Sequence, residues 1–277
     1  MRRLNLKHVI SEALLIQPRL WLIAEKLVRT HRRNIEPEEA LVPFLVRPNA
    51  VAIDIGANRG IYTRIMLTRT RNVICVEPNP DCARLLERVF GKDARVITGA
   101  ASNKNMDVTL RIPDAGSGFA TVEQGNLSFS GTFEPIRVKA FRIDDLQLEN
   151  VSFMKIDVEG HELAVLEGAL ETLKRNQPSI LLEAEERHRA RAVATVKEFL
   201  EALGYEGYML EREALVSIRS FDPTFHQSAE AARARRLTGR QGNSYINNFV
   251  FLATSSNGLF AYKERSLDSQ LQDGHGL

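Results

Sequence analysis

The stretch VAIDIGANRG, residues 51–60, has an aspartate near the end of an apolar run and two glycines after it. The apolar run predicts a buried strand over 50–55, and the glycine turn predicts the start of a helix. Dinucleotide sites use the spacing G-x-G-x-x-G, whereas Asn58 takes the place of the second glycine between Gly56 and Gly60 here. This strand-turn-helix unit therefore indicates a nucleotide-type site for a different ligand.

Short β-branched runs alternate with helical periods along the rest of the chain. Strands are predicted at residues 50–55, 72–76, 95–98, 151–156, 179–184 and 248–252. Apolar residues spaced three and four apart predict helices over 163–173 and 193–203, with Gly204 ending the second. The alternation predicts an α/β fold with a doubly wound, mainly parallel sheet covered by helices on both faces. Ligands of such sheets bind beyond the C-terminal ends of the strands.

The chain has 277 residues, 44% of them hydrophobic, which suffices for one large core with a small appendage. We predict an N-terminal helical extension over 1–47, the main domain over 48–263 and a loose tail over 264–277. The extension is basic and leucine-rich, but its apolar runs are too short for a spanning helix or a good signal peptide. Two amphipathic helices divided at Pro18 are expected, packed on the domain in preference to contacting a membrane surface or a partner.

Two further segments interrupt the alternation. Residues 105–141 predict a small β insertion, and 221–246 form a polar, arginine-rich excursion. The formal net charge of +2 gives no overall field to recruit nucleic acid or anionic membrane, so DNA is not a predicted partner. Cys75 and Cys82 do not suggest a disulfide framework, which favours a cytoplasmic location. The oligomeric state is left open.

Two carboxylates lie at the ends of consecutive predicted strands. A carboxylate at Asp54 would repel phosphates, whereas it suits a ligand with a cationic centre and an ammonium group, such as S-adenosylmethionine. Glu77, in the motif VEP at the end of the next strand, can accept hydrogen bonds from both ribose hydroxyls. Either residue alone could be a helix cap or a solvated strand end. Together they favour a cofactor site.

The stretch FMKIDVEGHELAVLEGAL, residues 153–170, contains the fourth strand of this sheet and the following helix. Asp157 leaves the strand end toward the predicted crevice. The Glu162 carboxylate is expected to interact favourably with the N-terminal end of the helix dipole. The same dipole disfavours a protonated His161, which would keep it a neutral base. Alternatively, His161 only caps the helix and contributes stability.

The motifs DIGANRGIYT, VEP, GAASN, RIDDL and KIDVEGHE, in this order, resemble the FkbM-type family of S-adenosylmethionine-dependent methyltransferases. The resemblance implies a class I methyltransferase fold with a seven-stranded sheet and methyl transfer usually to a hydroxyl oxygen. It also implies which residues line the cofactor: Asp54, Gly56, Asn58, Gly60 and Glu77, with Ala101 and Asn103 near the adenine. The family commonly has an aspartate at the position of Asn103.

Two features that the sequence lacks limit the class of methyl acceptor. A D/N-P-P-Y/F motif, typical of base-amine methylation, does not follow the fourth strand, and no cysteine nucleophile lies near that loop. We therefore expect O-methylation of a hydroxyl on a sugar, a glycan or a polyhydroxylated small molecule, with Asp157 and His161 as catalytic residues. A protein or RNA acceptor bound through basic residues in 233–240, or a non-catalytic module, are the alternatives. No metal ligand is predicted, and assistance by a divalent metal is left open.

Overall fold

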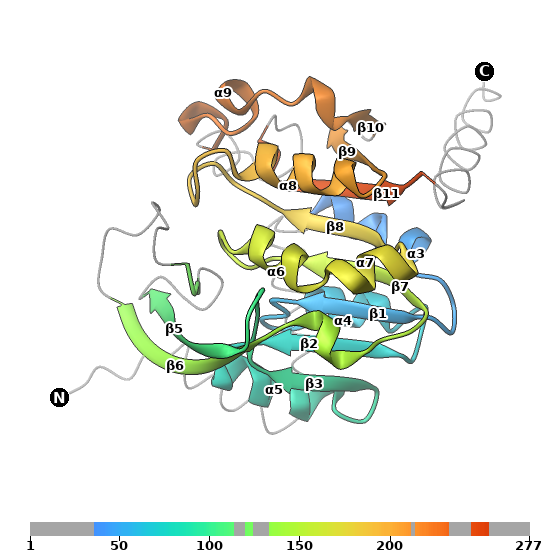
Figure 1. Cartoon of the computed structure of the whole chain (residues 1–277), viewed down its shortest axis with the longest axis vertical. Coiled ribbons are helices and arrows are strands. Elements are labelled where there is room, and N and C mark those ends of the chain that lie inside the picture. The colour runs from blue at the N-terminus through green and yellow to red at the C-terminus, as the bar shows by residue number, and fades with distance from the viewer. Residues whose placement is uncertain (1–35, 114–119, 124–132, 212–213, 233–244, 255–277) are drawn as a thin grey trace, which may run out of the picture.

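The computed structural model describes residues 36–113, 120–123, 133–211, 214–232 and 245–254. Its centre is a sheet of eight strands in the order β10-β9-β11-β8-β7-β1-β2-β3, which runs across Figure 1. The strands are β1 (Val51–Ile55), β2 (Val73–Glu77), β3 (Ala94–Thr98), β7 (Val151–Ile156), β8 (Ser179–Glu183), β9 (Tyr205–Glu211), β10 (Ala214–Ser217) and β11 (Asn248–Ala253). The five strands from β8 to β3 pair in parallel, whereas β11 is antiparallel to both of its neighbours.

Helices cover both faces of the sheet (Figure 1). One face carries α3 (Val42–Leu45), α4 (Ile61–Met66) and α5 (Pro80–Phe90), and the other carries α6 (Glu162–Gly168), α7 (Leu170–Asn176) and α8 (Ala192–Ala202). Short helical turns are η1 (Pro37–Ala40), η3 (Ile143–Leu146), η4 (Ile218–Ser220) and α9 (Pro223–His226). The molecule therefore has three layers, with the sheet in the middle.

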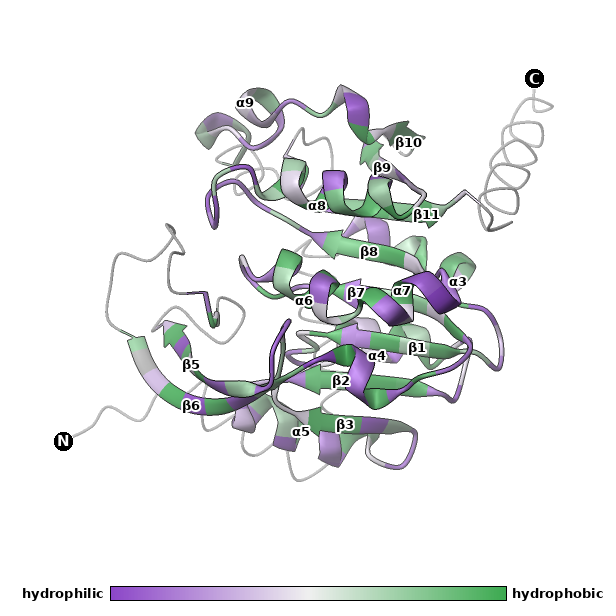
Figure 2. Ribbon diagram, viewed as in Figure 1, coloured by the Kyte–Doolittle hydropathy of each residue, from purple (hydrophilic) through white to green (hydrophobic). Residues whose placement is uncertain are grey.

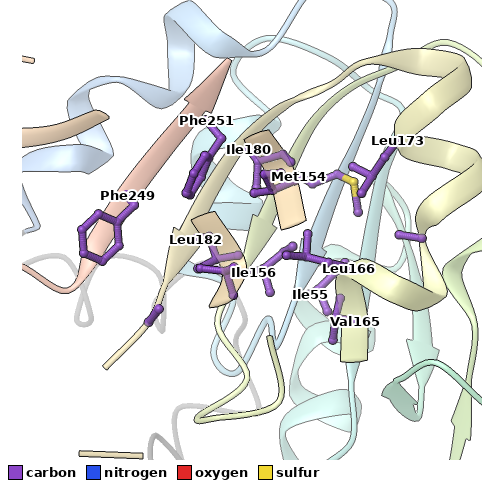
Figure 3. Close-up of a cluster of buried hydrophobic side chains, with 14 of the residues drawn as sticks. Ile55, Met154, Ile156, Val165, Leu166, Leu173, Ile180, Leu182, Phe249 and Phe251 are labelled. Carbon is purple, nitrogen blue, oxygen red and sulfur yellow. The ribbon is translucent and has the colours of Figure 1, made fainter. Parts of the chain in front are cut away.

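The central strands are buried on both faces because each face packs against helices. Every residue of β2, β7 and β11 is buried, and Figure 2 shows these strands as mainly hydrophobic. Figure 3 shows how side chains from the strands meet α6 and α7, with Met154 and Ile156 facing Leu166 and Leu173. Such a core fixes the strand ends, and thereby the residues that follow them, in one position.

Strand order reverses between β1 and β7. From β1 the chain continues to β2 and β3 on one side, and it later returns to place β7 on the other side of β1. A ligand crevice forms at this reversal, beyond the carboxyl ends of the strands, because the connections leave toward opposite faces. The loops after β1 and β7 border this place directly.

The strands match their predicted positions to within about one residue, a precision expected where burial sets the pattern, and β7 spans the predicted 151–156. Gly204 follows α8 with a positive φ of 82°, as expected for a helix stop. The helix predicted over 163–173 is instead two helices, which meet at Ala169. The hairpin of β9 and β10 was not predicted, and β10 adds an eighth strand at the sheet edge.

The predicted β insertion is present as a second sheet. It consists of β4 (Ala100–Ala101), β5 (Met106–Pro113) and β6 (Phe133–Phe141), and the long β5–β6 pair extends away from the main sheet in Figure 1. The amphipathic helices predicted around Pro18, the tail over 264–277 and the basic residues of 233–240 lie outside the described residues. Both cysteines are free and buried.

Candidate active site

A pocket lies at the reversal point, between the main sheet and the insertion. Six of the predicted site residues line it: Gly56, Asn58, Glu77, Ala101, Asp157 and His161. Its apolar wall comes from both sheets and includes Ile55, Val76, Ala100, Leu110 and Val122. The pocket lining therefore combines apolar side chains with carboxylates, as a nucleoside with a polar ribose requires.

Glu77 ends β2 and is 5% exposed. Its Oε2 accepts a hydrogen bond from the backbone N–H of Asn58 at 2.7 Å, and its Oε1 accepts one from Asn79 N–H at 2.8 Å. Burial raises the pKa of Glu77 to about 7, although both backbone bonds oppose the rise. The carboxylate is thus held rigidly at the pocket wall, and each oxygen keeps a lone pair for a further donor.

Asp54 lies behind the pocket wall, in β1. Its Oδ2 accepts hydrogen bonds from the backbone N–H of Thr63 at 2.8 Å and from Thr63 Oγ1 at 2.6 Å. Burial raises the pKa of Asp54, and the bonds from Thr63 oppose that change. Because Asp54 is 2% exposed and does not line the pocket, its observed role is to join β1 to the first turn of α4.

The turn between β1 and α4 needs both glycines, for different contacts. Gly56 has a φ of 79°, and an added Cβ would overlap the backbone oxygen of Asp157. Gly60 has a φ of 77°, and an added Cβ there would overlap Phe90 and Leu86 of α5. Gly56 therefore allows the loops after β1 and β7 to touch, whereas Gly60 packs against a helix and does not border the pocket.

Of the two residues predicted to lie near an adenine, only one lines the pocket. Ala101, in β4, lines the pocket. Asn103 does not line it, and its amide nitrogen donates a hydrogen bond to Glu167 Oε2 on α6 at 2.6 Å. The packing thus gives no support for an adenine contact by the Asn103 side chain.

Asp157 follows β7 directly, and its backbone N–H donates to Ile55 O, which continues the pairing of β7 with β1. Its side chain is 33% exposed, and its Oδ2 is 3.8 Å from the Nζ of Lys155. Burial raises the pKa of Asp157 to about 6, and the charge of Lys155 is the largest opposing influence. A carboxylate with this pKa is mostly ionised at neutral pH and can accept a proton.

His161 is held at both ring nitrogens. Its Nδ1 is 3.0 Å from Glu123 Oε2, and its Nε2 is 2.9 Å from Ser102 Oγ. A carboxylate at Nδ1 favours the tautomer with the proton on that nitrogen, which leaves Nε2 to accept from the serine hydroxyl. His161 is the N-cap residue of α6, but its side chain makes no capping hydrogen bond. The alternative in which the ring only caps the helix is therefore not what the structure shows.

Ser102 and Glu123 were not predicted as site residues. They lie 59 and 38 positions from His161 in the sequence, and although Ser102 stands in the motif GAASN, nothing in the sequence pattern places either residue against that ring. The insertion brings them together, because Thr121 Oγ1 donates to Glu159 O at 2.7 Å and fixes residues 120–123 on the loop after β7. Only the fold of the insertion creates this arrangement.

Further carboxylates surround the loop after β7. Glu159, at a positive φ of 53°, places its Oε2 2.9 Å from the Nε2 of buried His188. Glu162 is 2% exposed and accepts a hydrogen bond from Gly160 N–H at 2.7 Å, and burial raises its pKa to about 7. In the ranges that the structure describes, no three His, Cys, Asp or Glu side chains are grouped so as to hold a metal ion.

These residues fit S-adenosylmethionine. The buried Glu77 carboxylate can accept from two vicinal ribose hydroxyls, and Ala100 and Ala101 give the pocket an apolar wall against which an aromatic base can pack. The glycine turn at Gly56 brings backbone close to the same pocket.

Among the described helices, none has the length and apolar character to cross a membrane.

Comparison with known proteins also finds methyltransferases. Residues 54–207 match the model of the methyltransferase FkbM domain. The chain is 31% identical over 193 residues to the 2-O-methyltransferase NoeI of Sinorhizobium fredii, an alignment that covers 61% of this chain and 77% of that protein.

Two solved structures illustrate the structural neighbours. The methyltransferase FkbM of Methylobacillus flagellatus has a TM-score of 0.46 and 14% identity, covering 82% of this chain and 60% of that one. A TehB-like methyltransferase of Corynebacterium glutamicum has a TM-score of 0.45 and 12% identity, covering 86% and 98%.

The matched range begins at the first strand-end carboxylate and includes the pocket, the insertion and the loop after β7. The α/β fold with its mainly parallel central sheet is that of a class I methyltransferase. The chain therefore belongs to the FkbM family of methyltransferases, and S-adenosylmethionine is its cofactor.

Proposed function

We propose that the methyl acceptor is a hydroxyl oxygen of a sugar, a glycan or a polyhydroxylated small molecule. The observation that carries this proposal is the Asp157 carboxylate, which is partly exposed at the end of β7 and lines the cofactor pocket. An alcohol is a weak nucleophile until its proton is removed, so a carboxylate that can accept a proton suits it. The relative NoeI is named as a 2-O-methyltransferase, which supports the same acceptor class.

The chain's own residues would act by binding and orientation. S-adenosylmethionine supplies an electrophilic methyl group when it is bound. Asp157 accepts a hydrogen bond from the acceptor hydroxyl and takes its proton as the new oxygen–carbon bond forms and the carbon–sulfur bond breaks. Rigid placement of Asp157 by β7 contributes the alignment on which in-line transfer depends.

His161 is proposed as a second proton acceptor of the site. Its Nδ1 proton is directed to Glu123, and its Nε2 accepts a hydrogen bond from the Ser102 hydroxyl. A proton from the hydroxyl of the methyl acceptor would therefore reach the ring by way of Ser102. Asp157 needs no such relay. We therefore assign the larger role to Asp157 and treat His161 as supporting it.

A screen of acceptors tests this function. Purified protein and cofactor with a labelled methyl group are incubated with free sugars, glycolipid extracts, polyhydroxylated small molecules, protein and RNA. We expect label in a hydroxylated acceptor, and about 10²–10⁴-fold slower transfer in Asp157→Asn with a smaller change in cofactor affinity. Asp93→Asn, an exposed partner of Arg71, is the matched control.

Two results would contradict the proposal. The first is label found only in protein or RNA. The second is an Asp157→Asn protein that transfers methyl groups at the rate of the parent. A chain that binds the cofactor and labels no member of a broad panel would favour the non-catalytic alternative.

A further inference from the structure

Lys155 is a lysine with no exposure to solvent, near the carboxyl end of the central strand β7. A buried ammonium is costly unless other groups replace the water around it. Its Nζ lies 3.3 Å from Asn248 Oδ1 and 3.4 Å from Ile156 O. The ring of Tyr62 lies under it, with the centroid 5.0 Å from Nζ.

The groups that hold this ammonium are themselves held. Tyr62 O–H donates to Glu36 Oε2 at 2.5 Å, and Asn248 Nδ2 lies 3.4 Å from the same oxygen. The contacts come from α4, β11 and the segment before η1, three parts of the chain that the fold brings to one place. The ammonium is therefore fixed in position from several sides.

Carboxylates on three neighbouring strands face this cation. Asp54 belongs to β1, Glu183 to β8, and Asp157 follows β7. Burial raises the pKa of each of these three groups, and the charge of Lys155 opposes the rise in each. Glu159 and Glu162, from the loop and from α6, act on Asp157 in the opposite direction and raise its pKa.

We propose that Lys155 is a positioning residue, whose fixed ammonium pairs with Asp157 Oδ2 and holds that carboxylate at the strand end in the orientation that meets the acceptor. The inference rests on the proposed role of Asp157. Lys155 itself faces the protein interior and touches neither cofactor nor acceptor in this account. Its contribution is to keep Asp157 negatively charged at the pocket, although several other carboxyl groups nearby favour its protonation.

The electrostatic consequence has a defined sign. Loss of an opposite charge at this distance raises a carboxylate pKa by about 1–3 units. Without the ammonium, Asp157 would be largely protonated at pH 7, and methyl transfer would be roughly tenfold slower there for a shift of about two units. Raising the pH would restore the rate, whereas damage to the fold would not be reversed in this way.

Carbon-13 NMR of the full-length protein labelled at aspartate carboxyls tests the pairing without an acceptor. The Asp157 resonance is assigned by its loss in Asp157→Asn, and its titration is compared in the parent and Lys155→Met. We expect the midpoint to rise by about one unit or more in the variant. Lys174→Met, at an exposed lysine that pairs with Glu171 on α7, should leave it unchanged.

The second variant, Lys155→Gln, retains a donor for Asn248 and serves if Lys155→Met does not fold. An unchanged Asp157 midpoint in a folded, uncharged variant would overturn the proposal. The outcome is separate from that of the proposed function. If Asp157→Asn keeps full transfer, the role of Asp157 fails whatever the titration shows, and if only the midpoint fails to move, Lys155 alone loses its role.

Discussion

At the residue scale, the site depends on carboxylates that are buried but well provided with donors. Glu77 binds two backbone N–H groups, and Asp54 binds the amide and hydroxyl of Thr63. Their positions could be predicted because parallel strands end at the same edge of the sheet. The prediction could not distinguish a pocket wall from the layer behind it, and only Glu77 borders the pocket.

Glu77→Ala should weaken S-adenosylmethionine binding, because two hydrogen bonds to the ribose are lost. The expected cost is about 1.5–3 kcal/mol, measured by calorimetry on folded protein. Because Glu77 also holds Asn58 and Asn79, Glu77→Gln is the cleaner variant, since it retains one acceptor oxygen. Glu87→Gln, an exposed change on α5, is the control, and equal affinities in all variants would remove Glu77 from the cofactor site.

His161→Ala should lower single-turnover methyl transfer less than Asp157→Asn does, by about 10²-fold, because its ring receives a proton only through Ser102. Ser102→Ala should then reproduce most of the loss, because the hydroxyl lies on Nε2. Melting temperatures are measured in parallel. A destabilised His161→Ala protein with an undiminished rate would show that the ring only joins the insertion to the loop after β7.

At the element scale, the close approach of two loops organises the pocket. The turn after β1 and the loop after β7 touch through Gly56 and the Asp157 carbonyl. The residue pattern predicted a glycine turn at the cofactor site, and Gly56 does line the pocket, but the pattern did not predict the contact with Asp157. The contact partner lies about a hundred residues away, a separation that local periodicity does not report.

Gly56→Val should therefore abolish cofactor binding by separating these two loops, and it should also lower the melting temperature. This differs from a substitution that only fills the pocket, which would leave the melting temperature unchanged. Both the collision with Asp157 O and the positive φ oppose any side chain here. Calorimetry and thermal melts on Gly56→Ala and Gly56→Val check it; a native melt together with full cofactor affinity would contradict the described contact.

At the scale of the whole molecule, several carboxyl groups are buried with raised pKa values at one end of the sheet. Glu77 and Glu162 have pKa values of about 7 and Asp157 of about 6, with burial as the largest cause. The folded protein therefore binds protons more tightly than the unfolded chain between about pH 4.5 and 7. The free energy of unfolding should fall as the pH rises through this window.

Glu162→Gln should reduce this fall, because the amide can still accept from Gly160 N–H but carries no charge. The difference in unfolding free energy between pH 5 and pH 8 should shrink by on the order of 1–3 kcal/mol relative to the parent. Denaturant titrations at both pH values measure it. Glu171→Gln, exposed on α7, should leave the pH dependence as it is, and an equal effect of both changes would rule out burial as the cause.

The layers of the molecule and the strand-end residues could be predicted because burial leaves a periodic pattern in the sequence. Contacts made by the insertion, such as Glu123 with His161, could not, since they depend on how a separate sheet packs. The β9–β10 hairpin was also missed. Its strand β9 contains Gly207, against which Phe251 and Ile218 pack closely, and glycine weakens the strand pattern.

We propose that this FkbM-family chain transfers a methyl group to oxygen. The most direct measurement uses S-adenosylmethionine with a carbon-13 methyl group, a glycan or polyol acceptor from the screen, and NMR of the isolated product. We expect a methyl signal coupled through oxygen to a carbinol carbon, at a yield strongly reduced in Asp157→Asn. A labelled methyl group bound to nitrogen or carbon would contradict it.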